Sequence, residues 1–144
     1  MLSLNFQVGS MLNLMQEIVR NYGARGLAVN ALVHREDGQV LAVSRKYNHN
    51  DFGLPGGKVD PEDASLEDAI RREVEEETGL QIENLKIVYH AMNKQHYCIC
   101  FVGTVTGEIN TSEKGVVKWV DPLVVTRGTF KKYNTNLYKH LGIY

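Results

Sequence analysis

The residues best suited to carry chemistry are three glutamates near the middle of the chain, Glu73, Glu76 and Glu77. Their spacing of i, i+3 and i+4 places their side chains next to one another on a helix. On a helical wheel, Glu73 and Glu77 fall on the apolar side of that helix, and Glu76 lies on its flank. Carboxylates turned toward a protein core are costly unless they are paired or bound to a metal. Clustered carboxylate oxygens suit Mg²⁺ or Mn²⁺ better than zinc, so the pattern predicts a divalent-metal site.

The helix that must hold these glutamates is marked at both ends by the sequence. Ser65, followed three residues later by Asp68, is typical of an N-terminal capping box, so the helix is expected to begin just after Ser65. An earlier start at Pro61 is the alternative. Gly79 favours the left-handed conformation that ends many helices, which predicts a helix over residues 66–78.

Residues 72–80, Arg-Glu-Val-Glu-Glu-Glu-Thr-Gly-Leu, resemble the second half of the Nudix box, G-x5-E-x7-R-E-U-x-E-E-x-G-U, where U is a bulky aliphatic residue. They match every position that this half of the box specifies. Residues 54–58, Leu-Pro-Gly-Gly-Lys, also resemble the loop that leads into the box. The order of the surrounding strands is similar to the family's as well, so the resemblance extends over residues 24–142.

The first glutamate of the box is the one departure from the pattern. Counted forward from Gly57 it falls on Asp63, and counted back from Arg72 it falls on Ala64, so the loop is one residue longer than the pattern. We assign the role of this glutamate to Asp63, with Glu62 as the alternative.

The resemblance implies an α/β (α+β) fold, a three-layer αβα sandwich with a mixed sheet and the box as loop–helix–loop. It implies hydrolysis of a diphosphate bond in a nucleoside diphosphate linked to another group, with Mg²⁺ or Mn²⁺ as cofactor. Glu76 and Glu77 would be the main metal ligands, and Glu73 a further ligand or the base that orients water. The carbonyl of Gly57 would also bind the metal, and Arg72 would anchor the helix by ion pairing.

Further residues are expected to contact the substrate through the same resemblance. Arg45 ends a predicted strand where the family often carries a phosphate-binding arginine, and Lys58 could reach phosphate, although both also suit a plain surface role. An aromatic face suits a nucleobase, which applies to Phe52 before the box. The positions where MutT-like relatives read the base or carry an extra carboxylate correspond to Tyr133, Asn134 and Glu113, where packing, turn or loop roles are the alternatives.

The remaining elements follow from hydrophobic periodicity and turn residues. A hairpin is expected over residues 26–44, turning at Glu36-Asp37-Gly38, and the stretch from Arg45 to Gly57 is expected to be a loop. The other predicted strands cover residues 4–8, 85–91, 97–106 and 116–121, and the other predicted helices cover 11–22 and 130–141.

Length and composition limit the classes of protein that fit. A chain of 144 residues predicts a single domain, with the box at 57–80 and an N-terminal extension over 1–23. The net charge of -1 gives no basic field for nucleic acid or membranes. Cys98 and Cys100 read as buried thiols, and with no signal peptide or membrane span expected, the cytoplasm is the predicted compartment.

Two classes of function remain open at this point. The first is an enzyme acting on a small nucleotide, either a nucleoside triphosphate, oxidised or not, or a nucleotide sugar or dinucleotide. The second is a Nudix-fold binding or regulatory module without catalysis. Such modules typically lose glutamates of the box, whereas Glu73, Glu76 and Glu77 are all present, which favours the enzyme. A homodimer is also left open.

Overall fold

The computed structural model describes residues 8–110 and 115–143, and side chains from residue 11 onward. Its α-helices are α1 (Val8–Tyr22), α2 (Leu66–Thr78) and α3 (Lys131–Leu141), and a 3-10 helix, η1, covers Pro122–Thr126. Its strands are β1 (Leu27–Leu32), β2 (Val40–Arg45), β3 (Asn48–Gly53), β4 (Gly56–Lys58), β5 (Gln81–Asn93), β6 (His96–Thr106) and β7 (Val117–Val120).

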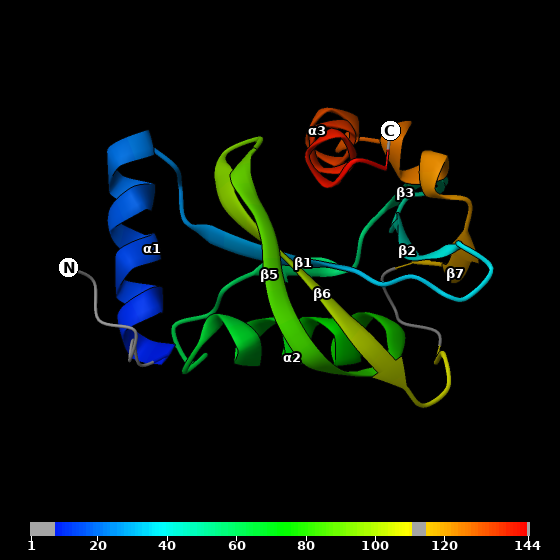
Figure 1. The fold of residues 1–144 in the computed structure, drawn as a ribbon, viewed down its shortest axis with the longest axis horizontal. Helices are drawn as coiled ribbons and strands as arrows, with labels where there is room; N and C mark the ends of the chain where they lie inside the picture. The colour runs from blue at the N-terminus through cyan, green and yellow to red at the C-terminus, as the bar shows by residue number, and fades with distance from the viewer. Residues whose placement is uncertain (1–7, 111–114, 144) are drawn as a thin grey trace.

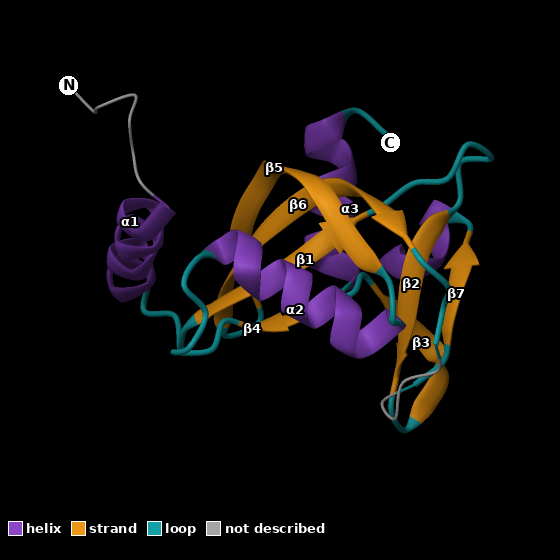
Figure 2. Ribbon diagram, turned by 90° about the horizontal axis from the view of Figure 1, so that it is seen from below, coloured by secondary structure: helices purple, strands orange, loops and turns teal. Residues whose placement is uncertain are grey.

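A mixed four-stranded sheet in the order β4-β1-β6-β5 forms the middle layer of the fold. Strands β1 and β6 run parallel, and the β4–β1 and β6–β5 pairs are antiparallel. Helix α2 covers one face of this sheet and α3 covers the other (Figure 1). A second, antiparallel sheet in the order β3-β2-β7 lies beside it (Figure 2). The expected αβα sandwich with a mixed sheet is therefore confirmed.

The alternation of side chains on the central strands builds one core on each face of the sheet. Val29 of β1 and Ile99 of β6 belong to the core beneath α2. Leu32 of β1 and the two cysteines of β6 belong to the core beneath α3. Cys98 and Cys100 are buried free thiols, as expected. Burial raises the pKa of the Cys98 thiol to about 12.

Helix α2 begins and ends where the sequence predicts. The hydroxyl of Ser65 accepts a hydrogen bond from the backbone N–H of Asp68 at 3.0 Å. Gly79 follows the helix in the left-handed conformation, with φ of 77°, and its N–H donates to the carbonyl of Glu75. These caps fix where α2 begins and ends. The helical period then sets the direction in which each of its side chains points.

The predicted hairpin over residues 26–44 is wrong beyond its turn. The turn forms, with Gly38 at φ of 85° and a single bridge between His34 and Val40. Strand β1, however, pairs with β4 on one edge and with β6 on the other, so it offers no free edge to β2. Strand β2 pairs instead with β7 and β3 in the second sheet.

The predicted loop from Arg45 to Gly57 is also wrong, because it contains β3 and β4. Their asparagines and glycines have low strand propensity, but the edges of β2 and β1 supply backbone partners, and tertiary pairing overrides propensity. Residues 1–7 lie outside the described residues, which leaves the strand predicted over 4–8 untested except that Val8 begins α1.

Helix α1 confirms the predicted amphipathic helix and stands at one end of the sheet (Figure 1). Met15 is its most deeply buried described residue, at 6% exposed, whereas Leu14 and Tyr22 are exposed. The ring of Tyr22 stacks on that of Tyr97 in β6, with centroids 5.5 Å apart. In the part of the chain that the structure describes, no helix is long and apolar enough to cross a membrane.

Candidate active site

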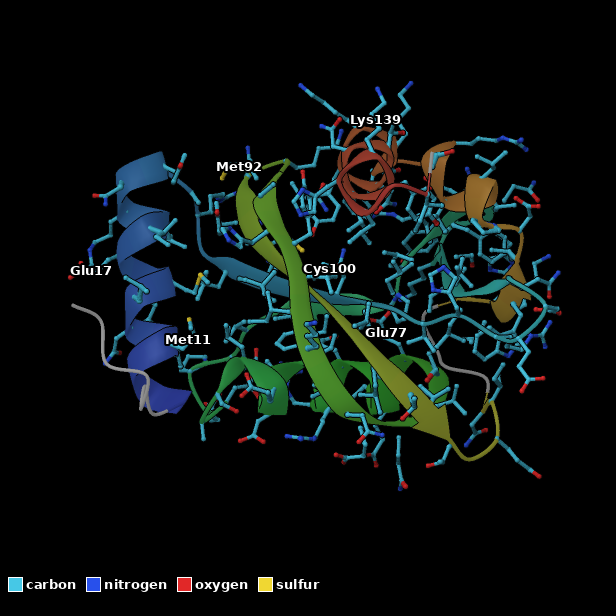
Figure 3. The ribbon with its side chains drawn as sticks, in the orientation of Figure 1. Met11, Glu17, Glu77, Met92, Cys100 and Lys139 are labelled. Carbon is cyan, nitrogen blue, oxygen red and sulfur yellow. The ribbon has the colours of Figure 1, made fainter. Side chains whose placement is uncertain are left out.

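Helix α2 carries two buried carboxylates on the side that faces the sheet. Glu73 is 7% exposed and Glu77 is 9% exposed, whereas Glu75 and Glu76 are exposed. Figure 3 shows Glu77 on the sheet-facing side of α2. The helical wheel therefore predicts correctly which glutamates turn inward, and the 3.6-residue period explains why Glu73 and Glu77 share that side.

Arg72 holds together the carboxylates at the N-terminal half of the site. Its Nη1 donates to Glu73 Oε1 at 2.9 Å and to Glu76 Oε2 at 3.3 Å. Its Nη2 donates to the carbonyl oxygen of Lys58 at 3.1 Å, which ties α2 to β4. The buried charge of Glu73 is thus paired inside the protein, so its burial does not by itself require a metal ion.

Asp63 forms the other half of this arrangement. Arg72 Nε and Nη2 donate to its two carboxylate oxygens at 3.0 and 2.9 Å, a bidentate pair. The Asp63 side chain is only 6% exposed. Hydrogen bonding from Arg72, and then from the N–H of Asp60, holds the pKa of Asp63 below its usual value. Of the candidates for the first carboxylate of the box, Asp63 is the one that reaches Arg72, whereas Glu62 and Ala64 are exposed.

Gly56 and Gly57 are required because other atoms occupy the space of a side chain. A Cβ on Gly56 would overlap the backbone carbonyl of Val29 in the neighbouring strand. A Cβ on Gly57 would lie 2.5 Å from Glu73 Oε2, so the absence of a side chain lets the carboxylate approach β4. The N–H of Gly56 donates to Glu77 Oε1 at 3.0 Å. Both inward glutamates therefore pack against the Gly-Gly segment that the sequence places before the box.

The donor atoms on α2 and β4 fit a hard divalent cation. They are carboxylate oxygens, with the Gly-Gly backbone beside them, and such oxygen donors are what Mg²⁺ and Mn²⁺ prefer. Within residues 8–110 and 115–143, no three His, Cys, Asp or Glu side chains converge on one point. Glu73 and Glu76 instead both accept hydrogen bonds from Arg72. Holding a cation here would therefore require these glutamates to turn away from the arginine.

A groove beside Glu77 is lined by charged side chains of both signs. We call it the glutamate groove; its lining includes Arg45, Lys46, Asp51, Gly57, Glu77 and Phe130. The Arg45 guanidinium lies over the Phe130 ring, 5.4 Å from its centroid. The predicted phosphate ligand Arg45 and the predicted metal ligand Glu77 are thus brought to one groove by β2 and α2.

A second hollow, the sheet cavity, lies on the α3 side of the central sheet and encloses about 180 Å³. Its lining includes Asn30 of β1, Lys58 of β4, Cys98 of β6, and Phe130 and Asn134 next to or on α3. Gly56, Gly57, Leu54 and Phe130 line both the sheet cavity and the glutamate groove.

The predicted base-reading residues reach this region in different ways. Asn134 lines the sheet cavity. Its Nδ2 donates to the carbonyl of Val125 at 2.9 Å, and this hydrogen bond holds the side-chain amide in place. Tyr133 is 3% exposed, and burial raises the pKa of its hydroxyl far above the usual value. Glu113 lies within residues 111–114, outside the described residues.

Phe52 is a candidate that the structure buries away from both hollows. It is 5% exposed and belongs to the core beneath α3. The alternation along β3 turns Phe52 inward and its neighbour Asp51 outward, and Lys118 Nζ covers the ring at 5.0 Å from the centroid. The prediction that Phe52 stacks on a base is therefore wrong.

Sequence reasoning missed two residues that shape the hollows, Phe130 and Asn30. Phe130 precedes α3 and borders both the sheet cavity and the glutamate groove, and nothing in its local sequence signals that role. Asn30 did carry a signal, because it is the one polar residue in the apolar run from Leu27 to Val33.

Comparisons with known proteins agree with this geometry. The model of the NUDIX domain family matches residues 24–141. A MutT-like protein of Streptomyces ambofaciens is 32% identical over 115 residues, which cover 77% of this chain and 73% of that protein. A Bacillus subtilis (strain 168) protein assigned provisionally as an 8-oxo-dGTP diphosphatase is 38% identical over 96 residues, which cover 63% of each chain.

Among solved structures, the MutT protein from Methanosarcina mazei Go1 superposes with a TM-score of 0.59 at 25% identity. The superposition covers 81% of this chain and 92% of that one. The family match spans every element from β1 to α3 and includes the box, the Gly-Gly segment and Arg72. The chain belongs to the NUDIX domain family of hydrolases.

Proposed function

We propose that this protein hydrolyses a diphosphate bond in a nucleotide, with Mg²⁺ or Mn²⁺ held by the glutamates of α2. The observation that carries the proposal is the meeting of two kinds of group in the glutamate groove. Glu77 and Gly57 supply oxygen atoms from α2 and β4, and Arg45 and Lys46 supply positive charge from β2 and the residue after it. A metal–diphosphate complex needs both kinds of group at once.

The roles proposed for the acidic residues are those that the resemblance to the Nudix box implies. Glu76 and Glu77 would be the main metal ligands, with the Gly57 carbonyl beside them. When bound, the divalent cation neutralises phosphate charge and lowers the pKa of a water molecule. Glu73 would act as a further ligand, for which its carboxylate must turn away from Arg72, or it would hold the attacking water while Arg72 positions its carboxylate through the contact at 2.9 Å.

The rest of the substrate is proposed to occupy the sheet cavity. The cavity and the groove share Leu54, Gly56, Gly57 and Phe130, so a diphosphate in the groove places its nucleoside at the mouth of the cavity. Lys58 and Lys94 border the cavity, and Lys131 and Lys132 border the adjoining hollow, which adds positive charge for phosphates.

The relatives favour a nucleoside triphosphate, in oxidised or ordinary form, as the substrate. One similar protein is named MutT-like, and another is assigned provisionally as an 8-oxo-dGTP diphosphatase. A nucleotide sugar or a dinucleotide is the alternative, since it would place the same diphosphate in the groove.

The proposal is tested with a panel of oxidised and ordinary dNTPs, sugar nucleotides, ADP-ribose and dinucleotides, assayed for released phosphate or pyrophosphate. We expect turnover of at least one nucleotide with Mg²⁺ or Mn²⁺, complete loss in excess EDTA, and recovery when the metal is restored. Full activity in EDTA would contradict the role of the metal. No turnover of any compound would contradict the enzyme and favour a binding module.

A further inference from the structure

Asp51 connects strand β3 to the segment that leads into α3. Its Oδ1 accepts a hydrogen bond from the backbone N–H of Thr129 at 2.8 Å, and its Oδ2 accepts one from the Thr129 hydroxyl. Both carboxylate oxygens are thus bound to one residue that lies 78 positions further along the chain. Hydrogen bonds to an ionised carboxylate are stronger than those between neutral groups, so the connection between the two segments is a firm one.

The segment that Asp51 holds lies directly against β3. A Cβ on Gly128 would overlap Asp51 Oδ1 and would lie 2.9 Å from the carbonyl oxygen of Phe52. Glycine at this position therefore lets the backbone approach the strand closely. The ring of Phe130 packs against Gly53, where a Cβ would lie 3.4 Å from Phe130 Cδ2. These contacts fix where the chain passes before α3 begins.

Phe130 is the side chain whose place depends on this connection. It is half-buried and borders the glutamate groove, the sheet cavity and the hollow that adjoins the cavity. Arg45, which lines the groove, has its guanidinium over the Phe130 ring. A shift of the segment before α3 would therefore change the groove and the cavity at the same time.

Asp51 also lines the glutamate groove, so a direct contact with the metal or the phosphates is the alternative. Its surroundings favour a supporting role, because each of its oxygens already accepts a hydrogen bond from Thr129. Partial burial alone would raise the pKa of Asp51, but the hydrogen bonds from Thr129 and the charge of Arg45 outweigh it and hold the pKa below its usual value. The ionised carboxylate is thus already paired within the protein.

We infer that Asp51 is a positioning residue of the substrate site, which acts through Thr129 to hold the Phe130 ring where the glutamate groove and the sheet cavity meet. The inference rests on the proposed function, because the place of the ring matters to a nucleotide that spans both hollows. Without the connection, the ring occupies its binding-competent place for only a fraction of the time, and the apparent affinity falls by that fraction. Saturating substrate selects the competent arrangement, so KM rises while kcat is largely kept.

Two substitutions remove the connection and one keeps it. Asp51→Ala removes both hydrogen bonds, and Thr129→Val removes the hydroxyl at similar size but keeps the N–H. With the best substrate of the panel, KM should rise about tenfold or more in Asp51→Ala and about threefold or more in Thr129→Val, with kcat within about threefold of wild type. Thr129→Ser keeps both donors and should bring KM back to near the wild-type value.

Asp121→Ala is the matched control. Asp121 caps η1 in a similar way, with Oδ1 accepting from the N–H of Leu123 at 2.9 Å, but it borders neither the groove nor the sheet cavity. This variant should lower the melting temperature slightly and leave KM and kcat at wild-type values. It thereby separates a loss of stability from a loss of positioning.

Fluorine NMR follows the ring without any substrate, in protein that carries para-fluorophenylalanine in place of Phe130. Wild type and Thr129→Ser should give one narrow resonance at the same shift, whereas Asp51→Ala and Thr129→Val should give a shifted or broadened one. An unchanged resonance in Asp51→Ala would overturn the inference. A fall in kcat at unchanged KM in Asp51→Ala, with Thr129→Val like wild type, would also overturn it and indicate a direct contact. A panel without any substrate would contradict the proposed function alone, and the fluorine spectra would then decide whether Asp51 holds Phe130.

Discussion

Replacing Arg72 with methionine should destabilise the protein more than any other loss of a single surface charge on α2. The guanidinium is 26% exposed at its side chain, and its partners Asp63 and Glu73 are 6% and 9% exposed. Removing one partner of a fully buried ion pair costs about 3–5 kcal/mol. Because Arg72 is partly in contact with solvent, we reduce this to about 2–3 kcal/mol, which lowers the melting temperature by roughly 5–10 °C.

Arg71→Met is the matched control on the next position of the same helix. Arg71 pairs with Asp68 and Glu83 at 3.4 Å, and all three side chains are well exposed. Such surface pairs contribute about 0–1 kcal/mol, so this variant should unfold close to wild type. The assay is urea denaturation followed by circular dichroism, at equal protein concentration and without divalent metal. Equal destabilisation by the two variants would refute the reasoning.

The same comparison should depend on pH with a defined sign. Arg72 lowers the pKa of Asp63 in the folded protein. A lowered folded-state pKa gives stability that is present above the unfolded value of about 3.9 and is lost as pH falls through the folded value. The difference in stability between wild type and Arg72→Met should therefore shrink as the pH is taken below about 4.

Three further predictions concern single side chains. Glu77→Gln keeps an acceptor for the Gly56 N–H but loses the negative charge. In a steady-state assay with Mg²⁺ its kcat should fall by about 100-fold or more, with folding intact. Glu75→Gln, at an exposed position of the same helix, should stay near wild type. Gly57→Ala should displace the carboxylate that lies 2.5 Å from the added Cβ and lower kcat, whereas Gly26→Ala, whose nearest contact is 3.8 Å, should not. Cys98, with its pKa raised to about 12 by burial, should resist iodoacetamide at pH 8 until the protein is unfolded, as mass spectrometry would show.

The local part of the site could be predicted from the sequence because its signals are short-range. The spacing of Glu73 and Glu77 and the caps at Ser65 and Gly79 depend only on the geometry of one helix. That geometry fixes which carboxylates turn inward, whatever the rest of the chain does. The assignment of Asp63 is less direct, since the loop length leaves two registers; the structure adds a bidentate contact between Asp63 and Arg72.

The parts that were missed depend on contacts between distant segments. Strand β3 forms because β2 offers it an edge, and a segment rich in Asn, Asp and Gly gives no sign of that. The expectation that Phe52 stacks on a base treats its segment as a loop, whereas the alternation of β3 buries the ring. The sheet cavity forms only when β1, β4, β6 and α3 come together. The sequence therefore shows Asn30 as a polar residue in an apolar strand, but it does not show that Asn30 lines a cavity.

The most direct test of the central claim is the position of Mn²⁺ in a crystal of this protein, located by its anomalous scattering. We predict a peak about 2.1 Å from carboxylate oxygens of Glu76 and Glu77, with those side chains turned from the partners they have here. A well-ordered crystal in excess Mn²⁺ with no peak there, and with Glu76 still on Arg72, would contradict the proposal that α2 holds the catalytic metal.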